Sequence, residues 1–139
     1  MTPNEEYGGP GGNQFTHSED GSYVKALLIY CARSETSEGG PYVVRGIYVS
    51  WANGGSNMIG TRAADEFQYF FEDGEEIVSM ALWTGERVDK MQFSTNRAKS
   101  FIAGGAGGYE HSLHVGRGRI ISLHGGAHGD VDRLGVDFD

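Results

Sequence analysis

The six residues VDRLGV at positions 131–136 recur in pattern at two other places in this chain of 139 residues. The other copies are VRGIYV at 44–49 and VDKMQF at 88–93. Each copy reads valine, a charged residue, any residue, a large apolar residue, any residue, and valine or phenylalanine. The charged positions are 44 and 43 residues apart: Arg45, Asp89 and Asp132. This regular spacing indicates a threefold internal repeat.

Apolar residues alternate within each copy, which is the spacing of a β-strand. Clusters of Gly, Asn, Asp and Ser separate the segments that show this alternation. One segment, GEEIVSMALW at 74–83, also fits a helix, but the TGERV turn that follows favours a strand and a hairpin. Seven segments are predicted to contain strands: SYVKALLIY (22–30), VVRGIYVSW (43–51), EFQYFF (66–71), EEIVSMALW (75–83), RVDKMQFST (87–95), GRIISLH (118–124) and DVDRLGVDF (130–138).

Three similar all-β units predict three small antiparallel sheets around a pseudo-threefold axis. Such a prism buries one face of each sheet and places the loops at its two ends. The length suits one domain with a real hydrophobic core. We therefore expect a single all-β domain over residues 1–139, in which residues 1–6 are loose.

Glycine pairs accompany the repeat at 11–12, 54–55 and 107–108, within a total of 23 glycines. A pair in a surface loop can simply supply the positive φ of a tight turn. It can also let a bare backbone N–H approach a ligand closely. The pairs alternate with the charged motifs along the chain, so each pair is expected to accompany one charged position.

The charged motif, as in GERVD at 85–89, can likewise have either a structural role or a ligand-binding role. An aspartate before a strand commonly caps a turn through its own backbone. Such a loop can also aim two backbone N–H groups and one carboxylate at a common point. Adjacent hydroxyls of a sugar ring donate side by side to one carboxylate and accept from backbone N–H groups. This pattern indicates recognition of a sugar, with neither a metal nor a nucleophile.

The sequence resembles the jacalin-related lectins of the mannose-binding type. The resemblance implies a β-prism of three four-stranded, antiparallel, Greek-key-like sheets with pseudo-threefold symmetry. It also implies carbohydrate binding without catalysis and without a cofactor. The segments that carry it follow the family's order: GGPGGNQF (8–15), DGEEIVSM (73–80), FSTN (93–96) and ISLHGGAHGDVDRLGV (121–136).

The family's principal sugar site joins the N-terminal glycine loop to the last G-x-x-x-D loop. Carried over to this chain, the site consists of Gly12, the backbone of Gly129 and Asp130, and the carboxylate of Asp132. The first glycine of the motif falls on His128, which leaves the geometry of this loop less certain than the aspartate itself.

Internal symmetry predicts a second site, in which the G-x-x-x-D motif is intact. Trp83 and Tyr109 lie beside it in the sequence, where they could pack on a sugar face, and a core or rim role for Trp83 is an equal alternative. The predicted residues of the second site are Gly108, Glu86, Arg87 and Asp89.

A third site would pair Gly55 with position 45. Arg45 has no acceptor atom in its side chain, so this site is predicted not to bind sugar. The chain continues through MTPNEEYGGPGG at 1–12, whereas the galactose-preferring branch of the family is cut near the glycine loop. We therefore expect glycans or glycoproteins that contain mannose or glucose as partners. The resemblance to the family also implies a homodimer or other homo-oligomer.

Charge and hydropathy exclude other partner classes. The formal net charge is −8, with 11 Lys and Arg against 19 Asp and Glu, which disfavours nucleic acid. The longest apolar runs are too short for membrane insertion. Cys31 has no partner for an intrachain disulfide and is expected to be buried and inert. Without a recognisable signal peptide, a cytoplasmic location is expected, with secretion by another route as an alternative.

Four alternatives were weighed against a lectin. Zinc binding by the C-terminal histidines is disfavoured because His111 and His114 would point to opposite faces of one strand. The segment GGAHGDVDRL is similar to a single copy of a calcium β-roll repeat, which needs tandem copies. Hydrolases need a placed nucleophile or two carboxylates on opposite sides of the sugar, and neither pattern is present. A prism that serves as an oligomerisation or docking module remains an alternative.

Overall fold

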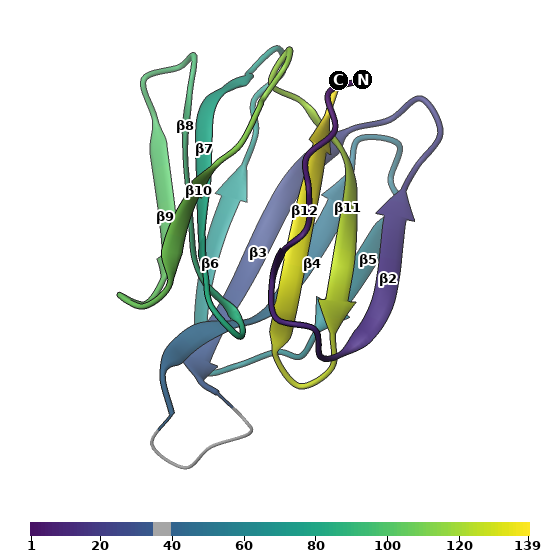
Figure 1. Ribbon diagram of the computed structural model, residues 1–139. Coiled ribbons are helices and arrows are strands. Elements are labelled where there is room, and N and C mark those ends of the chain that lie inside the picture. The colour runs from purple at the N-terminus through teal and green to yellow at the C-terminus, as the bar shows by residue number, and fades with distance from the viewer. Residues whose placement is uncertain (35–39) are drawn as a thin grey trace.

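The computed structural model describes residues 1–34 and 40–139, and its strands form three four-stranded antiparallel sheets (Figure 1). One sheet, in the order β5-β4-β3-β6, contains β3 (Val24–Arg33), β4 (Tyr42–Trp51), β5 (Ser56–Gly60) and β6 (Asp65–Phe70). The second, in the order β10-β7-β8-β9, contains β7 (Ile77–Thr84), β8 (Val88–Thr95), β9 (Ser100–Gly104) and β10 (Tyr109–Ser112). The third, in the order β1-β12-β11-β2, contains β1 (Tyr7–Gly8), β2 (Asn13–Ser18), β11 (Ile120–Ala127) and β12 (Val131–Phe138).

The all-β fold with three four-stranded sheets is confirmed. The three copies of the repeat lie in β4, β8 and β12, which occupy the same central position in their respective sheets. The ambiguous segment at 74–83 contains strand β7 and pairs with β8 as the hairpin interpretation predicts. Within the described residues no helix is long and apolar enough to span a membrane.

Five strands do not stand out in the sequence: β1, β2, β5, β9 and β10. All five lie at the edges of their sheets and contain two to six residues. An edge strand packs against one neighbour only and carries more polar residues, so its apolar alternation is weak. The predicted strands include the two central strands of every sheet, where alternation is strongest.

The core lies between the three sheets and receives large side chains from each of them. Leu27 and Ile47, Leu82 and Met91, and Leu123 and Leu134 are all fully buried central-strand residues. Cys31 is also fully buried, as predicted, and burial raises the pKa of its thiol to about 12. A thiol that stays protonated is a poor nucleophile, so this cysteine contributes to packing.

The expectation that residues 1–6 are loose is wrong. The backbones of Thr2 and Phe138 exchange two hydrogen bonds, of 2.7 and 2.9 Å. The backbone N–H of Asn4 donates to Asp137 Oδ1 at 3.0 Å, and the Asn4 amide donates to the carbonyl oxygen of Val136 at 2.8 Å. The segment thereby extends the pairing of β1 along β12, which explains why a polar stretch is held in place.

Glu6 fixes this segment further through charge. One Glu6 carboxylate oxygen lies 2.7 Å from His124 Nδ1, and the other accepts from Arg133 Nε at 3.1 Å. The other ring nitrogen of His124 lies 3.2 Å from Asp137 Oδ1. Burial alone would lower the pKa of His124, but the hydrogen bonds to Glu6 and Asp137 raise it overall. When it is protonated, His124 donates to both carboxylates and so ties β11 to both β12 and the N-terminal segment.

The prism has two ends, which we call the loop pole and the terminal pole. The loop pole, at the bottom of Figure 1, carries the β7–β8 and β11–β12 connections and the turn between β1 and β2. The terminal pole, at the top, carries both chain ends. All residues predicted to bind sugar lie at the loop pole, in its connections or, for Asp89 and Asp132, at the second residue of the strand that follows.

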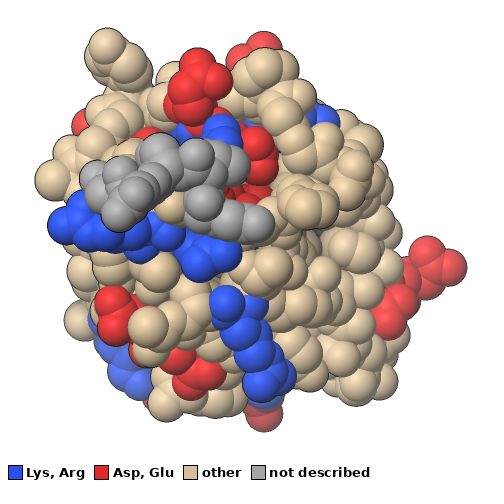
Figure 2. All heavy atoms as spheres, turned by 90° about the horizontal axis from the view of Figure 1, so that it is seen from below, with Lys and Arg blue, Asp and Glu red and all other residues tan. Residues whose placement is uncertain are grey.

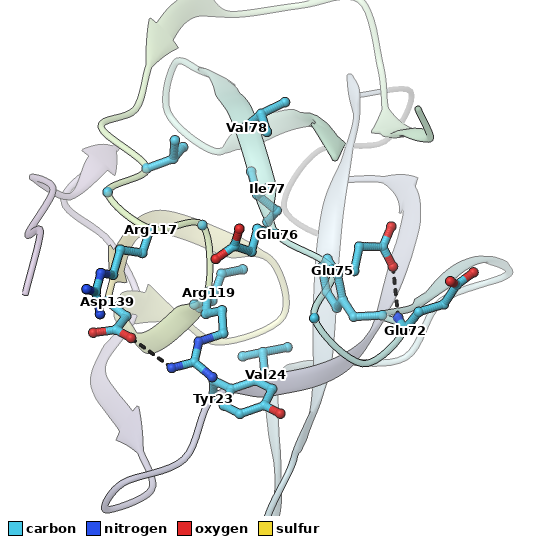
Figure 3. A pocket seen from close by; sticks show the side chains of 16 residues that line it. Tyr23, Val24, Glu72, Glu75, Glu76, Ile77, Val78, Arg117, Arg119 and Asp139 are labelled. Atoms are coloured by element: carbon cyan, nitrogen blue, oxygen red, sulfur yellow. Dashed lines mark hydrogen bonds and ion pairs between the residues drawn. The ribbon is translucent and has the colours of Figure 1, made fainter. Parts of the chain in front are cut away.

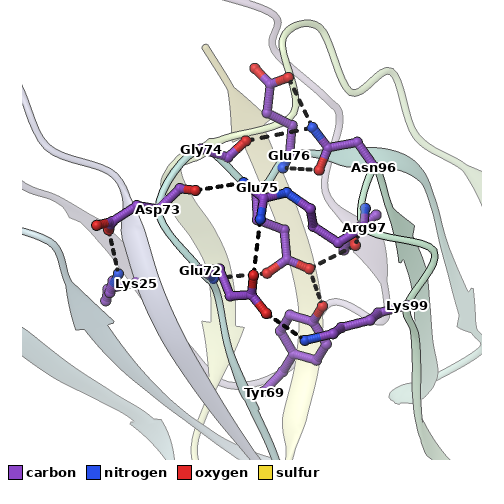
Figure 4. A network of polar contacts seen from close by, with 11 residues as sticks. Lys25, Tyr69, Glu72, Asp73, Gly74, Glu75, Glu76, Asn96, Arg97 and Lys99 are labelled. Atoms are coloured by element: carbon purple, nitrogen blue, oxygen red, sulfur yellow. Dashed lines mark hydrogen bonds and ion pairs between the residues drawn. The ribbon is translucent and has the colours of Figure 1, made fainter.

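The terminal pole is held by a buried carboxylate, shown in Figure 4. Glu75 is 4% exposed and accepts hydrogen bonds from the Glu72 backbone N–H at 2.8 Å, from Thr95 Oγ1 at 2.7 Å and from the Tyr69 hydroxyl. Burial raises the pKa of Glu75, but these three donors lower it overall. The ionised side chain is satisfied by the protein itself and ties β6, β7 and β8 together at this end.

Candidate functional site

The three sheets make the same contact at the loop pole. In each, a residue just after an edge strand donates its backbone N–H to the carbonyl oxygen of the charged residue of the repeat. The three bonds measure 2.8, 2.8 and 3.0 Å: Gly9 to Asp132, Gly105 to Asp89, and Thr61 to Arg45. These bonds show which positions of the three repeats are equivalent. They therefore show where a glycine pair would lie in each repeat if it accompanied the charged residue.

The first of these contacts borders a cavity of about 420 Å³, which we call the Asp132 site. The structure brings together Gly12, Gly129, Asp130 and Asp132, the four residues predicted for the principal site. Their part in binding stays a prediction. The cavity is lined by Gly11, Gly12, Asn13, Arg87, His128, Gly129, Asp130 and Asp132.

The glycine turn lies directly against the Asp132 carboxylate. A Cβ atom added to Gly11 would be 2.5 Å from Asp132 Oδ2. Gly12 has a φ of +79°, and a Cβ there would be 2.6 Å from the backbone nitrogen of Ala127. Only glycine permits both the backbone conformation and the approach at these positions. A buried acceptor and bare backbone therefore meet in one shallow cavity.

Asp130 is an internal anchor of this pole. Its side chain is 1% exposed and accepts from Ser34 Oγ at 2.7 Å, from Arg45 Nε at 3.1 Å and from Arg87 Nε at 3.1 Å. These partners come from the other two sheets: Arg45 from strand β4, and Ser34 and Arg87 from connections. The Asp130 carboxylate therefore joins its loop to the other two repeats. The role of the Asp130 backbone in binding stays a prediction.

Arg87 enters the Asp132 site from the second repeat, a contribution that the sequence analysis missed. Its Nε bonds Asp130, and its Nη1 lies 3.4 Å from Asp132 Oδ2. Burial raises the pKa of Asp132, and the Arg87 guanidinium opposes this by favouring the ionised carboxylate. No local motif could have shown this contact because Arg87 and Asp132 are 45 residues apart in the sequence.

The replacement of a glycine by His128 leaves the loop intact. The His128 backbone N–H donates to the Asp130 carbonyl oxygen at 3.0 Å, and the equivalent bond from Gly85 to Arg87 is also 3.0 Å. Neither His128 nor Gly85 has a positive φ. The first position of the motif thus does not require glycine, and the exposed His128 imidazole lies at the rim of the cavity.

The second candidate, which we call the Asp89 site, repeats the same geometry around a buried carboxylate. Gly108 has a φ of +84°, and Cβ atoms on Gly107 and Gly108 would each lie 2.8 Å from an oxygen of Asp89. Burial raises the pKa of Asp89, and a hydrogen bond from the Gly85 backbone partly opposes this. Gly108 and Asp89 are therefore brought together as predicted, while their function stays a prediction.

The other two residues predicted for the Asp89 site, Glu86 and Arg87, are only partly at that site. The backbones of Glu86 and Arg87 stay in the loop before Asp89, but the Arg87 side chain turns to the Asp132 site. Tyr109 follows Gly108 and is 79% exposed, which suits a rim position. Trp83 is on the outer face of its sheet, where Lys90 Nζ lies 4.0 Å from the ring centroid.

The assignment of Gly55 to a third site is wrong. Gly54 and Gly55 form the turn between β4 and β5, where the Gly54 N–H donates to the Trp51 carbonyl oxygen at 2.9 Å. The neighbouring backbone N–H of Ala52 bonds Tyr23, so this turn lies at the terminal pole, far from Arg45 along β4. The positive φ of Gly54, +97°, serves a hairpin and not a ligand.

The positions equivalent to a glycine pair in this repeat are Ala63 and Ala64. Asp89 and Gly108 are 19 residues apart, and the same step from Arg45 leads to Ala64. The Arg45 side chain is 21% exposed and donates through Nε to Asp130 and to the Gly129 carbonyl oxygen. The third position thus lacks both the acceptor and the glycine pair, and its arginine supports the Asp132 site.

Figure 2 shows the molecule from the loop-pole end. On this face the Lys and Arg side chains form a band at the left and a second group below the centre, and groups of Asp and Glu side chains lie close to both. The mixed charge agrees with the ion pairs that join Arg45 and Arg87 to the aspartates.

A larger cavity, of about 670 Å³, lies at the terminal pole (Figure 3). Its walls carry the acidic residues of the β6–β7 connection on one side and Arg117 and Arg119 on the other. Arg119 is paired with Asp139 at 2.9 Å and lies 4.4 Å from the Tyr23 ring centroid. None of the residues predicted to bind sugar lines this cavity.

The histidines considered for zinc have other neighbours. The His111 ring stacks on Tyr7 with a centroid distance of 4.0 Å, and His124 lies between Glu6 and Asp137. Among residues 1–34 and 40–139, no group of three or more His, Cys, Asp or Glu side chains is placed to hold a metal ion.

The sequence profile of the jacalin-like lectin domain matches residues 4–137, almost the whole chain. The chain belongs to this family. Membership of the family accounts for the arrangement of three four-stranded sheets. It also supports carbohydrate binding. No curated protein sequence matches this jacalin-like chain.

Solved structures agree with the family. The chain superposes on the crystal structure of a lamprey immune protein with a TM-score of 0.85 and 27% identity, covering 99% of this chain and 44% of that one. It thus spans less than half of the lamprey protein. A mannose-binding lectin from champedak gives 0.77 and 21%, covering 99% and 96%. A mannose-binding jacalin-related lectin from Ananas comosus gives 0.77 and 18%, covering 96% and 94%.

Proposed function

We propose that this jacalin-like domain binds glycans that contain mannose or glucose through two sites, the Asp132 site and the Asp89 site. The observation that carries the proposal is the repeated contact between a buried carboxylate and a glycine turn. The contact occurs twice at equivalent positions, and at the third position both halves are replaced. A turn that served the fold alone would have no reason to change together with the aspartate opposite it.

The chemistry of the contact suits vicinal hydroxyls. The carboxylate of Asp132 or Asp89 accepts from two hydroxyl groups, while backbone N–H groups of the adjoining loops donate to the same oxygens. Because Gly12 and Gly108 have no side chain, the turn leaves space for a sugar ring to reach the carboxylate. Recognition of this kind involves no bond making or breaking, and we propose no catalytic role.

The names of two similar structures, the champedak and Ananas comosus lectins, support mannose as the first ligand to test. Both candidate sites are shallow, so each is expected to bind a monosaccharide weakly, with a dissociation constant on the order of millimolar to micromolar. Two sites on one chain raise the avidity for branched glycans. A homodimer or other homo-oligomer, which we also propose, would raise it further.

A glycan array with the intact protein and the Asp89→Asn, Asp132→Asn double variant tests the proposal. The intact protein is expected to retain mannose- or glucose-terminated glycans, and the double variant is expected to lose them. Asp73→Asn is the matched control, because the Asp73 side chain is 99% exposed and lies at the terminal pole. If the intact protein binds no glycan, the proposed function is wrong and a docking module becomes the better description.

A further inference from the structure

At the loop pole, side chains of two repeats each contact the charged residue of the next repeat, and the contacting residue has the same position in both. Two residues before the charged position, the three repeats have Arg87, Asp130 and Val43. Arg87 contacts Asp132 of the next repeat, and Asp130 in turn contacts Arg45 of the repeat after that. The equivalent residue that precedes the Asp89 site in this cycle is Val43, which is fully buried and carries no charge. The two candidate sites thus differ in one cross-repeat contact.

We propose that Arg87 is a positioning residue of the Asp132 site and that this contact makes the two sites differ in acid tolerance. The Asp132 site keeps its ligand to lower pH, while the Asp89 site, which has Val43 in place of the arginine, releases it earlier. At acid pH the domain thereby passes from two working sites to one. This inference rests on the proposed sugar binding.

The geometry suits a positioning role. The Arg87 guanidinium is held by Asp130 at 3.1 Å and by the Glu86 carbonyl oxygen at 2.9 Å, and its side chain is 20% exposed. From this fixed position Nη1 faces Asp132 Oδ2. A rigid planar donor keeps one carboxylate oxygen in place and leaves the second lone pair of that oxygen and the whole of the other oxygen for two hydroxyl groups of a ligand. Arg87 acts through Asp132, and no contact of its own with a sugar is needed.

The groups around each carboxylate determine the sign of the pH effect. At Asp132, burial and the charge of Asp130 favour the neutral acid, while Arg87, Arg133 and His128 favour the carboxylate. At Asp89, burial favours the neutral acid and the Gly85 N–H opposes it; among the described residues no charged side chain has a resolved effect. Only the ionised form accepts from two hydroxyls, so binding falls as pH decreases through the pKa of each site.

Single-site variants separate the two sites. Asp89→Asn reports the Asp132 site alone, and Asp132→Asn reports the Asp89 site alone. We would titrate each with methyl α-mannoside by calorimetry from neutral to acidic pH. Binding by the Asp132→Asn protein is expected to disappear at a higher pH than binding by the Asp89→Asn protein. Coincident pH profiles would overturn the proposed difference, and absence of binding in both variants and the intact protein would overturn the proposed function itself.

Arg87 is then changed in the Asp89→Asn background. Arg87→Ala is expected to weaken binding about fivefold at neutral pH and to move the acid limit upward, with partial recovery in Arg87→Lys. Arg97→Ala removes an arginine at the terminal pole and is the matched control. An unchanged pH profile in Arg87→Ala would contradict the positioning role.

A measurement without sugar keeps the inference testable if Arg87→Ala loses stability through Asp130. The carboxyl ¹³C chemical shift of Asp132 reports its titration directly in the folded protein. We expect Asp132 to titrate at higher pH in Arg87→Ala than in Arg97→Ala. Equal titration in the two folded variants would show that Arg87 does not act on Asp132.

Discussion

The Asp132 and Asp89 sites have the same local geometry and are built from the chain in different ways. Asp89 and Gly108 are 19 residues apart and belong to one sheet, so this site forms within one repeat. Asp132 and Gly12 come from opposite ends of the sequence and meet because β1 pairs with β12. The comparison teaches that sites with the same local geometry can depend on different parts of the chain. The Asp132 site includes the docked N-terminal segment and a contact with Arg87 from another repeat.

Closing either glycine turn gives the sharpest contrast between the sites. Gly12→Val should abolish binding at the Asp132 site alone, and Gly108→Val should abolish it at the Asp89 site alone. Both residues have positive φ, and an added Cβ would lie 2.6 or 2.7 Å from backbone nitrogen. We expect a loss of about 3 kcal/mol, or roughly a hundredfold in affinity, by mannoside titration of the single-site proteins.

Gly21→Ala is the control for the effect of positive φ by itself. Gly21 has a φ of +67°, has open space around its Cβ position and lines a cavity together with the chain ends, Met1 and Asp139, at the terminal pole. It should lose some stability with normal binding at both sites. If Gly12→Val kept its affinity, the glycine turn would not be part of the sugar site.

Releasing the N-terminal segment should affect one site only. Glu6→Ala removes the partner of His124 and Arg133 and should weaken the Asp132 site about tenfold, because the glycine turn follows five residues later. The Asp89 site should be unchanged in the same protein. Titration of both single-site backgrounds checks this, and equal weakening of the two sites would show that Glu6 supports the whole fold instead.

The support of the Asp132 site should itself depend on pH through His124. Its folded-state pKa is raised, so its contribution to stability is present below its ordinary pKa and is lost as pH rises through the folded value. His124→Gln should therefore lower the melting temperature by a few degrees at acidic pH and by less at alkaline pH. The difference in melting temperature between the two proteins across pH is the measurement. A constant difference would exclude protonation as the cause.

The smallest expected effect concerns stability at the Asp89 site. Burial disfavours the charged form of Asp89 in the folded protein and thereby raises the pKa of this carboxyl. Asp89→Asn should thus leave the melting temperature equal or about 2 °C higher at neutral pH while sugar binding is lost. Calorimetric unfolding with a mannoside titration of the same sample tests this. A clear loss of stability would favour a purely structural aspartate.

Much of this architecture could be predicted from the repeat, because central strands bury one face and so alternate strictly. The pairing of Gly12 with Asp132 came from family resemblance, since no local signal joins residues at opposite ends of a chain. The misplaced Gly55 shows the limit of composition: a hairpin turn and a ligand turn both select glycine. A fixed 19-residue step from Asp89 to Gly108 would have pointed to Ala64 instead.

Contacts made across repeats lay beyond sequence reasoning. Arg87 follows Glu86 in a loop that resembles any solvated charged turn, and its two aspartate partners become neighbours only after the three sheets have assembled. The docked position of residues 1–6 was also missed because polar residues gave no apolar pattern. Hydrogen bonds and ion pairs hold Asn4 and Glu6 in place, and their specificity depends on geometry rather than hydropathy.

The pairing of Thr2 with Phe138 has a consequence for how this domain can be displayed. Both of its ends leave the prism at the terminal pole, on the side opposite the two candidate sugar sites (Figure 1). A tether, a solid support or a fused domain joined at either end would therefore leave the loop pole facing outward. Surface immobilisation through either end should preserve access for a large glycoprotein, and the choice of end becomes a matter of convenience.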